Sequence, residues 1–107
     1  MKADVSYTSA SDIFETLEAV RLAKFPEGTW DKNISKAKEE CDEVLLTGQR
    51  SKRLVEYCDV LTCTINAARA DGFSPHEIVA ALLYKAAVNS HRKQAIRADG
   101  LYQHVDE

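Results

Sequence analysis

The stretch from Lys38 to Asp59, KEECDEVLLTGQRSKRLVEYCD, decides the fold of this chain. Two segments with helical periodicity lie on either side of Gly48 and a short basic linker, Gln49 to Lys52, so the stretch predicts two consecutive antiparallel helices. Outside it, capping residues and apolar spacing predict two more helices. The expected boundaries are Ser9 or Ser11 to about Phe25, about Asp31 to Thr47, about Ser51 to Ala70, and a fourth helix that begins at Ser74 and Pro75. The sequence therefore predicts an all-α fold that is similar to a four-helix bundle.

Carboxylates occupy matching positions in the two central helices. Glu40 and Glu43 are one helical turn apart in the first, and Glu56 and Asp59 repeat that spacing in the second. The second pair lies in a segment apolar enough to be buried, and buried carboxylates are normally paired or bound to a metal. The two pairs could therefore form an oxygen-rich site for Mg²⁺, or for Mn²⁺. The alternative is that the acidic run from Glu39 is a solvated helix face, which leaves the second pair unexplained.

Further polar and aromatic residues have two interpretations each. Lys85, Asn89 and Arg92 share one face of the fourth helix and would suit a phosphate chain. Cations near a helix C-terminus also complement the helix dipole without any ligand. Trp30, the sole tryptophan, is either a core or interface anchor or a surface on which a base stacks.

Composition indicates an ordinary soluble domain. A chain of 107 residues allows one domain, expected to span 1–107, and its 45% hydrophobic and 29% charged residues are typical of globular proteins. The net charge of −3 argues against binding to a nucleic-acid polymer. Neither a signal peptide nor a long apolar stretch is evident, so a cytoplasmic location without a membrane partner is expected. Cys41, Cys58 and Cys63 lack zinc-ligand spacing and are expected to be reduced, small core residues.

The acids form a pattern that resembles a known family. Glu39-Glu40-x-x-Glu43 followed by Glu56-x-x-Asp59 resembles the signature EExxE…ExxD of the all-α nucleoside triphosphate pyrophosphohydrolases of the MazG type. The stripe formed by Lys85, Asn89 and Arg92 resembles the K…N…R stripe of the same family. Trp30 and the tail Asp99-Gly100-x-x-x-His104-Val105 are similar to features of short bacterial and phage members. The resemblance covers residues 25–105.

The resemblance implies a Mg²⁺-dependent hydrolase that cleaves a nucleoside triphosphate between its α and β phosphates and releases the monophosphate and pyrophosphate. It implies metal ligands at Glu40, Glu43, Glu56 and Asp59, and Glu39 would bind a further ion or orient the attacking water beside Glu40 and Glu43. Lys85, Asn89 and Arg92 would hold the phosphates, and Trp30 would contact the base.

Substrate and assembly are less constrained by the sequence. Short members with a similar tryptophan and tail favour dGTP or dATP and a role in nucleotide-pool control in a bacterial or phage-infected cell, while pyrimidine deoxynucleotides and phosphoribosyl-ATP stay open. Apolar residues on more than one face of the third helix, and the resemblance itself, predict a homodimer or homotetramer. The contrasting hypothesis is a non-catalytic helical interaction module in which the acids pair with Lys52, Arg53 and Arg92.

Overall fold

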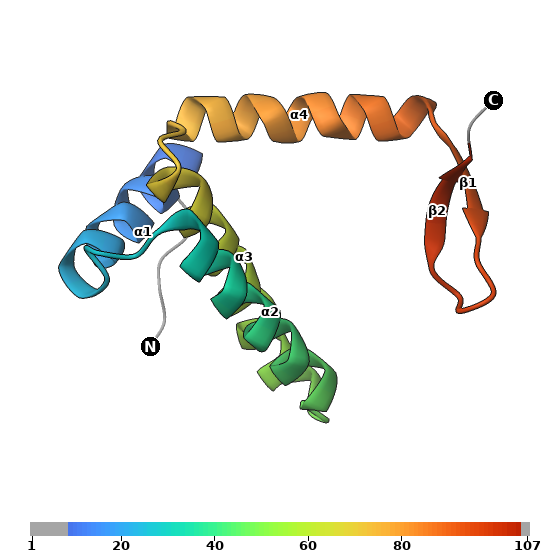
Figure 1. Ribbon diagram of the computed structural model, residues 1–107, viewed down its shortest axis with the longest axis horizontal. Helices are drawn as coiled ribbons and strands as arrows, with labels where there is room; N and C mark the ends of the chain where they lie inside the picture. The colour runs from blue at the N-terminus through green and yellow to red at the C-terminus, as the bar shows by residue number, and fades with distance from the viewer. Residues whose placement is uncertain (1–8, 106–107) are drawn as a thin grey trace. The chain divides into compact units, whose positions relative to one another are not determined.

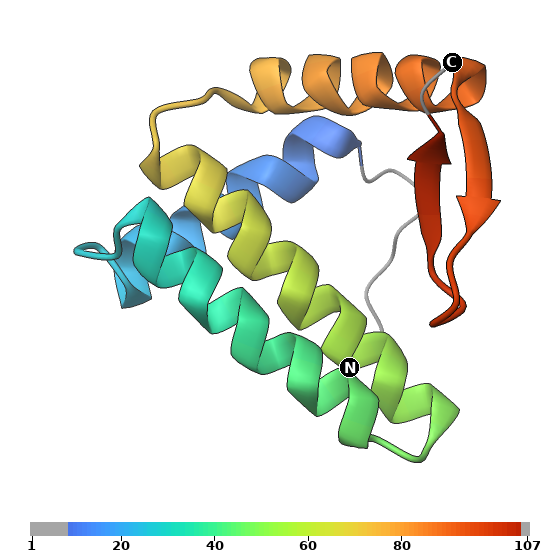
Figure 2. The same cartoon turned by 45° about the vertical axis from the view of Figure 1, so that its right-hand side comes forward.

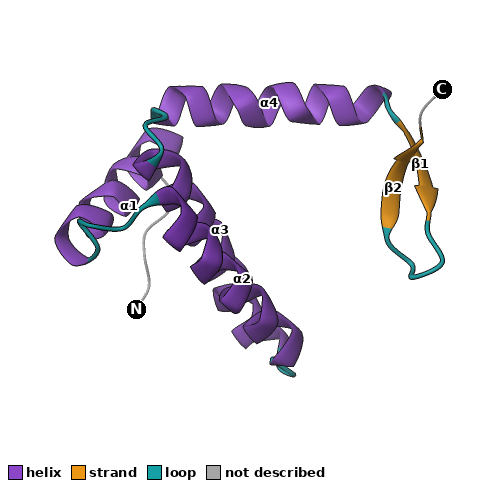
Figure 3. Cartoon of the chain, viewed as in Figure 1, coloured by secondary structure: helices purple, strands orange, loops and turns teal. Residues whose placement is uncertain are grey.

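The computed structural model describes residues 9–105, apart from the side chains of Ala10 and Ser11. Within this range the chain forms four helices followed by two strands (Figures 1 and 3). The elements are α1 (Ala10–Lys24), α2 (Trp30–Leu46), α3 (Arg50–Ala70), α4 (Pro75–His91), β1 (Lys93–Ile96) and β2 (Tyr102–Val105). They confirm the predicted all-α class, to which the strands add a hairpin that was not predicted. The chain divides into two compact units, Met1–Pro75 and His76–Glu107, which are described separately.

Helix α1 begins with the capping box that the sequence predicts. The Ser9 hydroxyl accepts a hydrogen bond from the Asp12 amide at 3.2 Å, and the Asp12 carboxylate accepts one from the Ser9 amide at 3.1 Å. These hydrogen bonds lower the pKa of Asp12, the backbone donor having the larger effect. The helix ends at Lys24, before Phe25 and Pro26, because proline disfavours helical geometry in the residue that precedes it.

Helices α2 and α3 lie side by side in both ribbon views (Figures 1 and 2) and form an antiparallel pair. Only residues 47–49 separate them, so the chain reverses direction abruptly. The Thr47 hydroxyl donates to the Glu43 carbonyl at 2.7 Å, and the Arg53 guanidinium donates to the Thr47 carbonyl at 3.2 Å. These side chains satisfy carbonyls that the end of α2 would otherwise leave without partners. At the end of α3, Gly72 has a φ of 97°, as its predicted terminating role requires.

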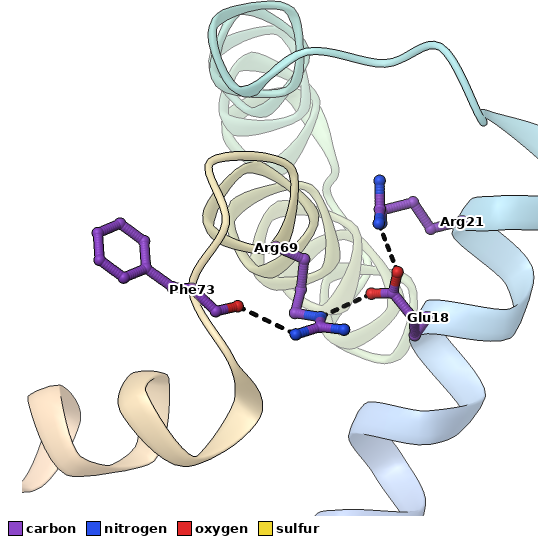
Figure 4. Close-up of polar contacts among 4 residues, drawn as sticks. All are labelled: Glu18, Arg21, Arg69 and Phe73. Carbon is purple, nitrogen blue, oxygen red and sulfur yellow. Dashed lines mark hydrogen bonds and ion pairs between the residues drawn. The ribbon is translucent and has the colours of Figure 1, made fainter.

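An ion-pair network joins α1 to the end of α3 (Figure 4). The Glu18 carboxylate accepts hydrogen bonds from Arg21 and, at 2.7 Å, from Nε of Arg69, whose guanidinium also donates to the Phe73 carbonyl at 3.1 Å. The Glu18 side chain is only 18% exposed. The hydrogen bond from Arg21, with that from Arg69, lowers the pKa of Glu18 against the opposing effect of partial burial. The network fixes α1 against the helix that carries half of the candidate site.

The hydrophobic core of the chain is small. Among the described residues, the buried apolar side chains are Phe14, Ala37 and Ala67. Helix α3, which was expected at the centre of a bundle, exposes large apolar residues: Leu54, Val55, Tyr57 and Leu61. Cys41 and Cys58 are also exposed, and Cys63 is half-buried, so the expectation that the thiols are core residues is wrong for the first two. Helices α2 and α3 bury the faces that meet each other.

The C-terminal unit contains most of α4 and the hairpin. Helix α4 begins at Pro75, as the sequence predicts, and none of its residues, all of which the structure describes, is buried. Strands β1 and β2 pair antiparallel, with Lys93 opposite Val105 and Ile96 opposite Tyr102. Gly100, with a φ of 85°, forms the turn. None of the described helices combines the length and apolar character that crossing a bilayer requires.

Candidate metal centre

Three carboxylates from two helices converge on one point. Glu40 and Glu43 come from α2 and Glu56 from α3, and one oxygen of each lies within 4.8 Å of the others. They meet because α2 and α3 run antiparallel and each presents its acidic turn to the other. Glu40 is buried, Glu56 is half-buried and Glu43 is exposed. The structure thus brings together three of the four acids that the sequence singles out as metal ligands.

Two of these carboxylates have an oxygen without a partner. Oε2 of Glu40 and Oε2 of Glu56 are buried and accept no hydrogen bond from any described residue. A buried anionic oxygen that is left unpaired costs free energy, since it has lost its hydration without compensation. Hard divalent cations take carboxylate oxygens as ligands, so this set of donors fits a Mg²⁺ or Mn²⁺ ion.

The remaining two acids lie beside the cluster. Asp59 is exposed and lies outside the three-carboxylate group, so its predicted burial is wrong. It does line a cavity of about 450 Å³ together with Glu40. Glu39 is exposed and its carboxylate pairs with Nζ of Lys36 at 3.2 Å. The interpretation of the acidic run as a solvated face therefore holds for Glu39 and is wrong for Glu40.

The cavity contains polar residues that the sequence analysis missed. Asn33 and Lys36 line it from α2, and Cys63 and Asn66 line it from α3. Their spacing was the available signal, because they continue the stripes of Glu40 and Asp59 in steps of three or four positions. Burial, followed by the charges of Glu40 and Asp59, raises the pKa of the Cys63 thiol. The cavity therefore brings several polar side chains next to Glu40, a member of the acidic cluster.

Lys36 is the cation nearest to the cluster among the described residues. Its Nζ lies 3.5 Å from Oε1 of Glu40 and 3.2 Å from Oε2 of Glu39. The hydrogen bond from Lys36 to Glu39, followed by that to Glu40, raises the pKa of Lys36. Among the described residues of the N-terminal unit, none of the predicted acids pairs with Lys52 or Arg53. The salt bridges to these two residues that the interaction-module hypothesis requires are thus absent from the described part of this unit.

The predicted nucleotide-contacting residues come from other parts of the sequence. Lys85 and Asn89 are exposed on α4, and Arg92 is exposed immediately after that helix ends. Trp30 is 53% exposed and lines a second cavity, of about 250 Å³, with Phe73. This second cavity shares no lining residue with the first. The roles of these four residues in binding a nucleotide stay predictions.

A solved structure shares this architecture. The MazG-like pyrophosphohydrolase of cyanophage S-2L, bound to dGDP and three catalytic Mn²⁺ ions per active site, superimposes with a TM-score of 0.77 over 94% of this chain and 97% of the other. This chain has the MazG-like fold. The two sequences are 21% identical, so the likeness is one of fold. No protein-family model matches the chain, and comparison with curated proteins finds no match. The MazG-like fold is the one that the acidic signature predicted.

Proposed function

We propose that this chain hydrolyses a nucleoside triphosphate to the monophosphate and pyrophosphate with the help of divalent metal ions. The observation that carries the proposal is the convergence of Glu40, Glu43 and Glu56, with two buried oxygens that lack partners. A fold shared with a pyrophosphohydrolase that binds dGDP and Mn²⁺ supports the same chemistry. The absence of salt bridges from the predicted acids to Lys52 and Arg53, within the described residues, favours this function over a non-catalytic interaction module.

Glu40, Glu43 and Glu56 would hold the metal, with Asp59 at the edge of the cluster that faces the cavity. Mg²⁺ is the proposed ion and Mn²⁺ would replace it, since both prefer oxygen ligands. When bound, the metal neutralises charge on the phosphoryl oxygens and lowers the pKa of a coordinated water. Water is then the direct nucleophile, so no side chain of the protein has to form a covalent intermediate.

The protein contributes position and charge. The partial burial of Glu40 and Glu56 fixes their carboxylates before the substrate arrives, which avoids reorganisation during the reaction. Glu39, exposed beside the cluster, would bind a further ion or orient the attacking water. Further roles are proposed for Lys85, Asn89 and Arg92, which would hold the phosphate chain, and for Trp30, which would contact the base.

A purine deoxynucleotide, dGTP or dATP, is the proposed substrate. The dGDP bound to the protein of similar fold is a purine deoxynucleotide and supports this choice. Pyrimidine deoxynucleotides and phosphoribosyl-ATP are the alternatives that the assay below must separate. The reaction would control nucleotide pools in the cytoplasm of a bacterial or phage-infected cell.

The active species is proposed to be a homodimer or homotetramer of one-domain subunits. Large apolar side chains are exposed at the turn between α2 and α3, including Leu45 at 84% and Leu46 at 85%. Such surfaces are commonly covered in an assembly. Light scattering of the purified protein would measure the number of subunits.

The test is incubation of the purified protein with each common NTP and dNTP, and with phosphoribosyl-ATP, in Mg²⁺. The expected products are the monophosphate and pyrophosphate in equal amounts, with dGTP or dATP cleaved fastest. Glu56→Gln and Asp59→Asn should each lower kcat by at least roughly 100-fold while the helical spectrum persists. Asp42→Asn is the matched control, because Asp42 belongs to the same acidic run but is exposed and outside the cluster. Release of inorganic phosphate alone, or no hydrolysis of any of these compounds, would refute the proposal.

A further inference from the structure

Lys36 occupies an unusual position for a lysine near a metal centre. It lies one turn before Glu40 on α2, and its side chain remains 54% exposed while it lines the 450 Å³ cavity. Its ammonium group contacts one oxygen of Glu40, at 3.5 Å, and leaves the other oxygen of that carboxylate buried and without a partner. The cation and the proposed metal therefore share one carboxylate.

We propose that Lys36 serves the proposed hydrolase as a mobile cation, which pairs with Glu40 before the metal arrives and contacts a substrate phosphate once the metal is bound. The inference rests on the proposed function. Lys36 suits both partners because its ammonium is a compact charge with three donors on a flexible chain, so it can turn without breaking a fixed geometry. The exposed fraction of the side chain leaves it free to make this movement.

The cavity supplies a place for the second partner. Asn66 lines it and is only 8% exposed. A second lysine, Lys32, and the amide of Asn33 line the same space. The amide of Asn66 therefore offers a hydrogen-bonding group at the wall of the cavity. Glu40 and Asp59 also line the cavity, so the two lysines favour an anionic ligand once a metal neutralises these carboxylates.

This exchange predicts opposite effects on two affinities. Without Lys36, Glu40 loses a competing cation, so the nucleotide-free protein should bind Mn²⁺ about two- to fivefold more tightly, as expected for a half-exposed ion pair. The same change removes a charged contact to phosphate, so the metal-loaded protein should bind nucleotide roughly tenfold more weakly. A lysine that merely stabilised the fold would weaken both affinities together.

The experiment is calorimetric titration of the wild type, Lys36→Met and Lys38→Met. Lys38 is the matched control, because it is an exposed lysine of α2 that does not line the cavity. Each protein is titrated with MnCl₂ alone, and then, saturated with Mn²⁺, with a dGTP analogue that carries a methylene group between its α and β phosphates. Lys36→Gln is measured in parallel in case the methionine variant does not fold.

The expected result is tighter Mn²⁺ binding and weaker analogue binding in the Lys36 variants, with both affinities unchanged in Lys38→Met. Lys36→Arg should recover most of the nucleotide affinity, because it keeps the charge. Unchanged or weaker Mn²⁺ binding, or unchanged analogue binding, in the Lys36 variants would overturn the inference. If the inference fails in this way but the wild type binds Mn²⁺ and hydrolyses triphosphates, the proposed function is unaffected. A wild type that binds no Mn²⁺ would overturn the proposed function itself.

Discussion

The substitution Glu56→Gln should stabilise the metal-free protein while it abolishes metal binding. Glu56 lies within 4.8 Å of two other carboxylates, Glu40 and Glu43. Two like charges at that distance repel by about 0.9 kcal/mol in water and about 3.5 kcal/mol at an effective dielectric constant of 20. Since the site is partly open to solvent, the neutral side chain should raise the free energy of unfolding by about 1–2 kcal/mol, and its amide can donate to a neighbouring carboxylate.

The assay is thermal unfolding in EDTA at low salt and again in excess Mn²⁺. For a domain of this size, 1 kcal/mol corresponds to about 4–8 °C, so Glu56→Gln should melt several degrees above the wild type in EDTA. In excess Mn²⁺ the order should reverse, because ligand at 100 times its Kd adds about 2.7 kcal/mol to the protein that binds it. In 1 M NaCl the difference in EDTA should shrink, because the Debye length falls to about 3 Å.

The control is Asp42→Asn, which removes a charge from the same helix outside the cluster and should change the free energy of unfolding by less than about 0.5 kcal/mol in either buffer. A lower melting temperature for Glu56→Gln than for the wild type in EDTA would refute the repulsion on which the reasoning depends. Such a result would mean that other groups of the protein already stabilise the charged Glu56 carboxylate. That is incompatible with a site that binds a cation through this carboxylate.

Three further predictions concern the rest of the chain. Glu18→Gln should lower the free energy of unfolding by about 1.5–3 kcal/mol at pH 7, because it breaks charged hydrogen bonds to two arginines. Urea titration would measure this change, with Glu15→Gln as the control because Glu15 is exposed. The pKa of Glu18 is lowered, so the stability that its carboxylate contributes is complete above the pKa of a glutamate in the unfolded chain and is lost as the pH falls through the folded pKa. The two proteins should therefore converge in stability below the ordinary pKa of a glutamate. With the two exposed cysteines replaced by serine, Cys63 should react with iodoacetamide more slowly than a model thiol at pH 8, because burial and nearby carboxylates raise its pKa. The reaction rate of Cys63 should rise only at higher pH. Equal rates for Cys63 and the model thiol at pH 8 would contradict this prediction. Gly100→Ala should weaken the hairpin by about 1 kcal/mol, seen as faster amide exchange in its strands, because alanine disfavours a φ of 85°.

Local signals in the sequence were enough to place the helices. The capping box at Ser9, the proline at Pro75 and the glycine at Gly72 each predicted the helix end that the structure has. The hairpin was missed although its signal was present: Asp99 and Gly100 form a typical turn dipeptide between two short runs with strand character. The strands are four residues long, and such short runs carry little periodicity of their own.

The burial of the acids could not be predicted in the same way. Local composition left a solvated face open as the alternative for the run that begins at Glu39, yet the run contains Glu40, the most buried acid of the site, at 8% exposure. Asp59 was expected to be buried among apolar neighbours and is exposed. Local composition does not decide which face of α2 meets α3, because the register of the two helices is set by packing along their whole length. The spacing of the acids was therefore a better guide to the site than their surroundings.

The environment of Glu40 distinguishes a binding site from a structural salt bridge. A buried carboxylate that serves stability needs a buried partner and hydrogen bonds to both oxygens, since the loss of hydration otherwise exceeds the attraction. Glu40 has neither: its partner Lys36 is half-exposed at 3.5 Å, and its second oxygen has no partner among the described residues. On α1, the half-buried Glu18 shows the satisfied arrangement, with one arginine on each oxygen. The same chain thus satisfies the half-buried Glu18 and leaves the buried Glu40 without a partner for one oxygen. An unsatisfied acid beside two more carboxylates is the expected state of a site whose missing partner is a cation.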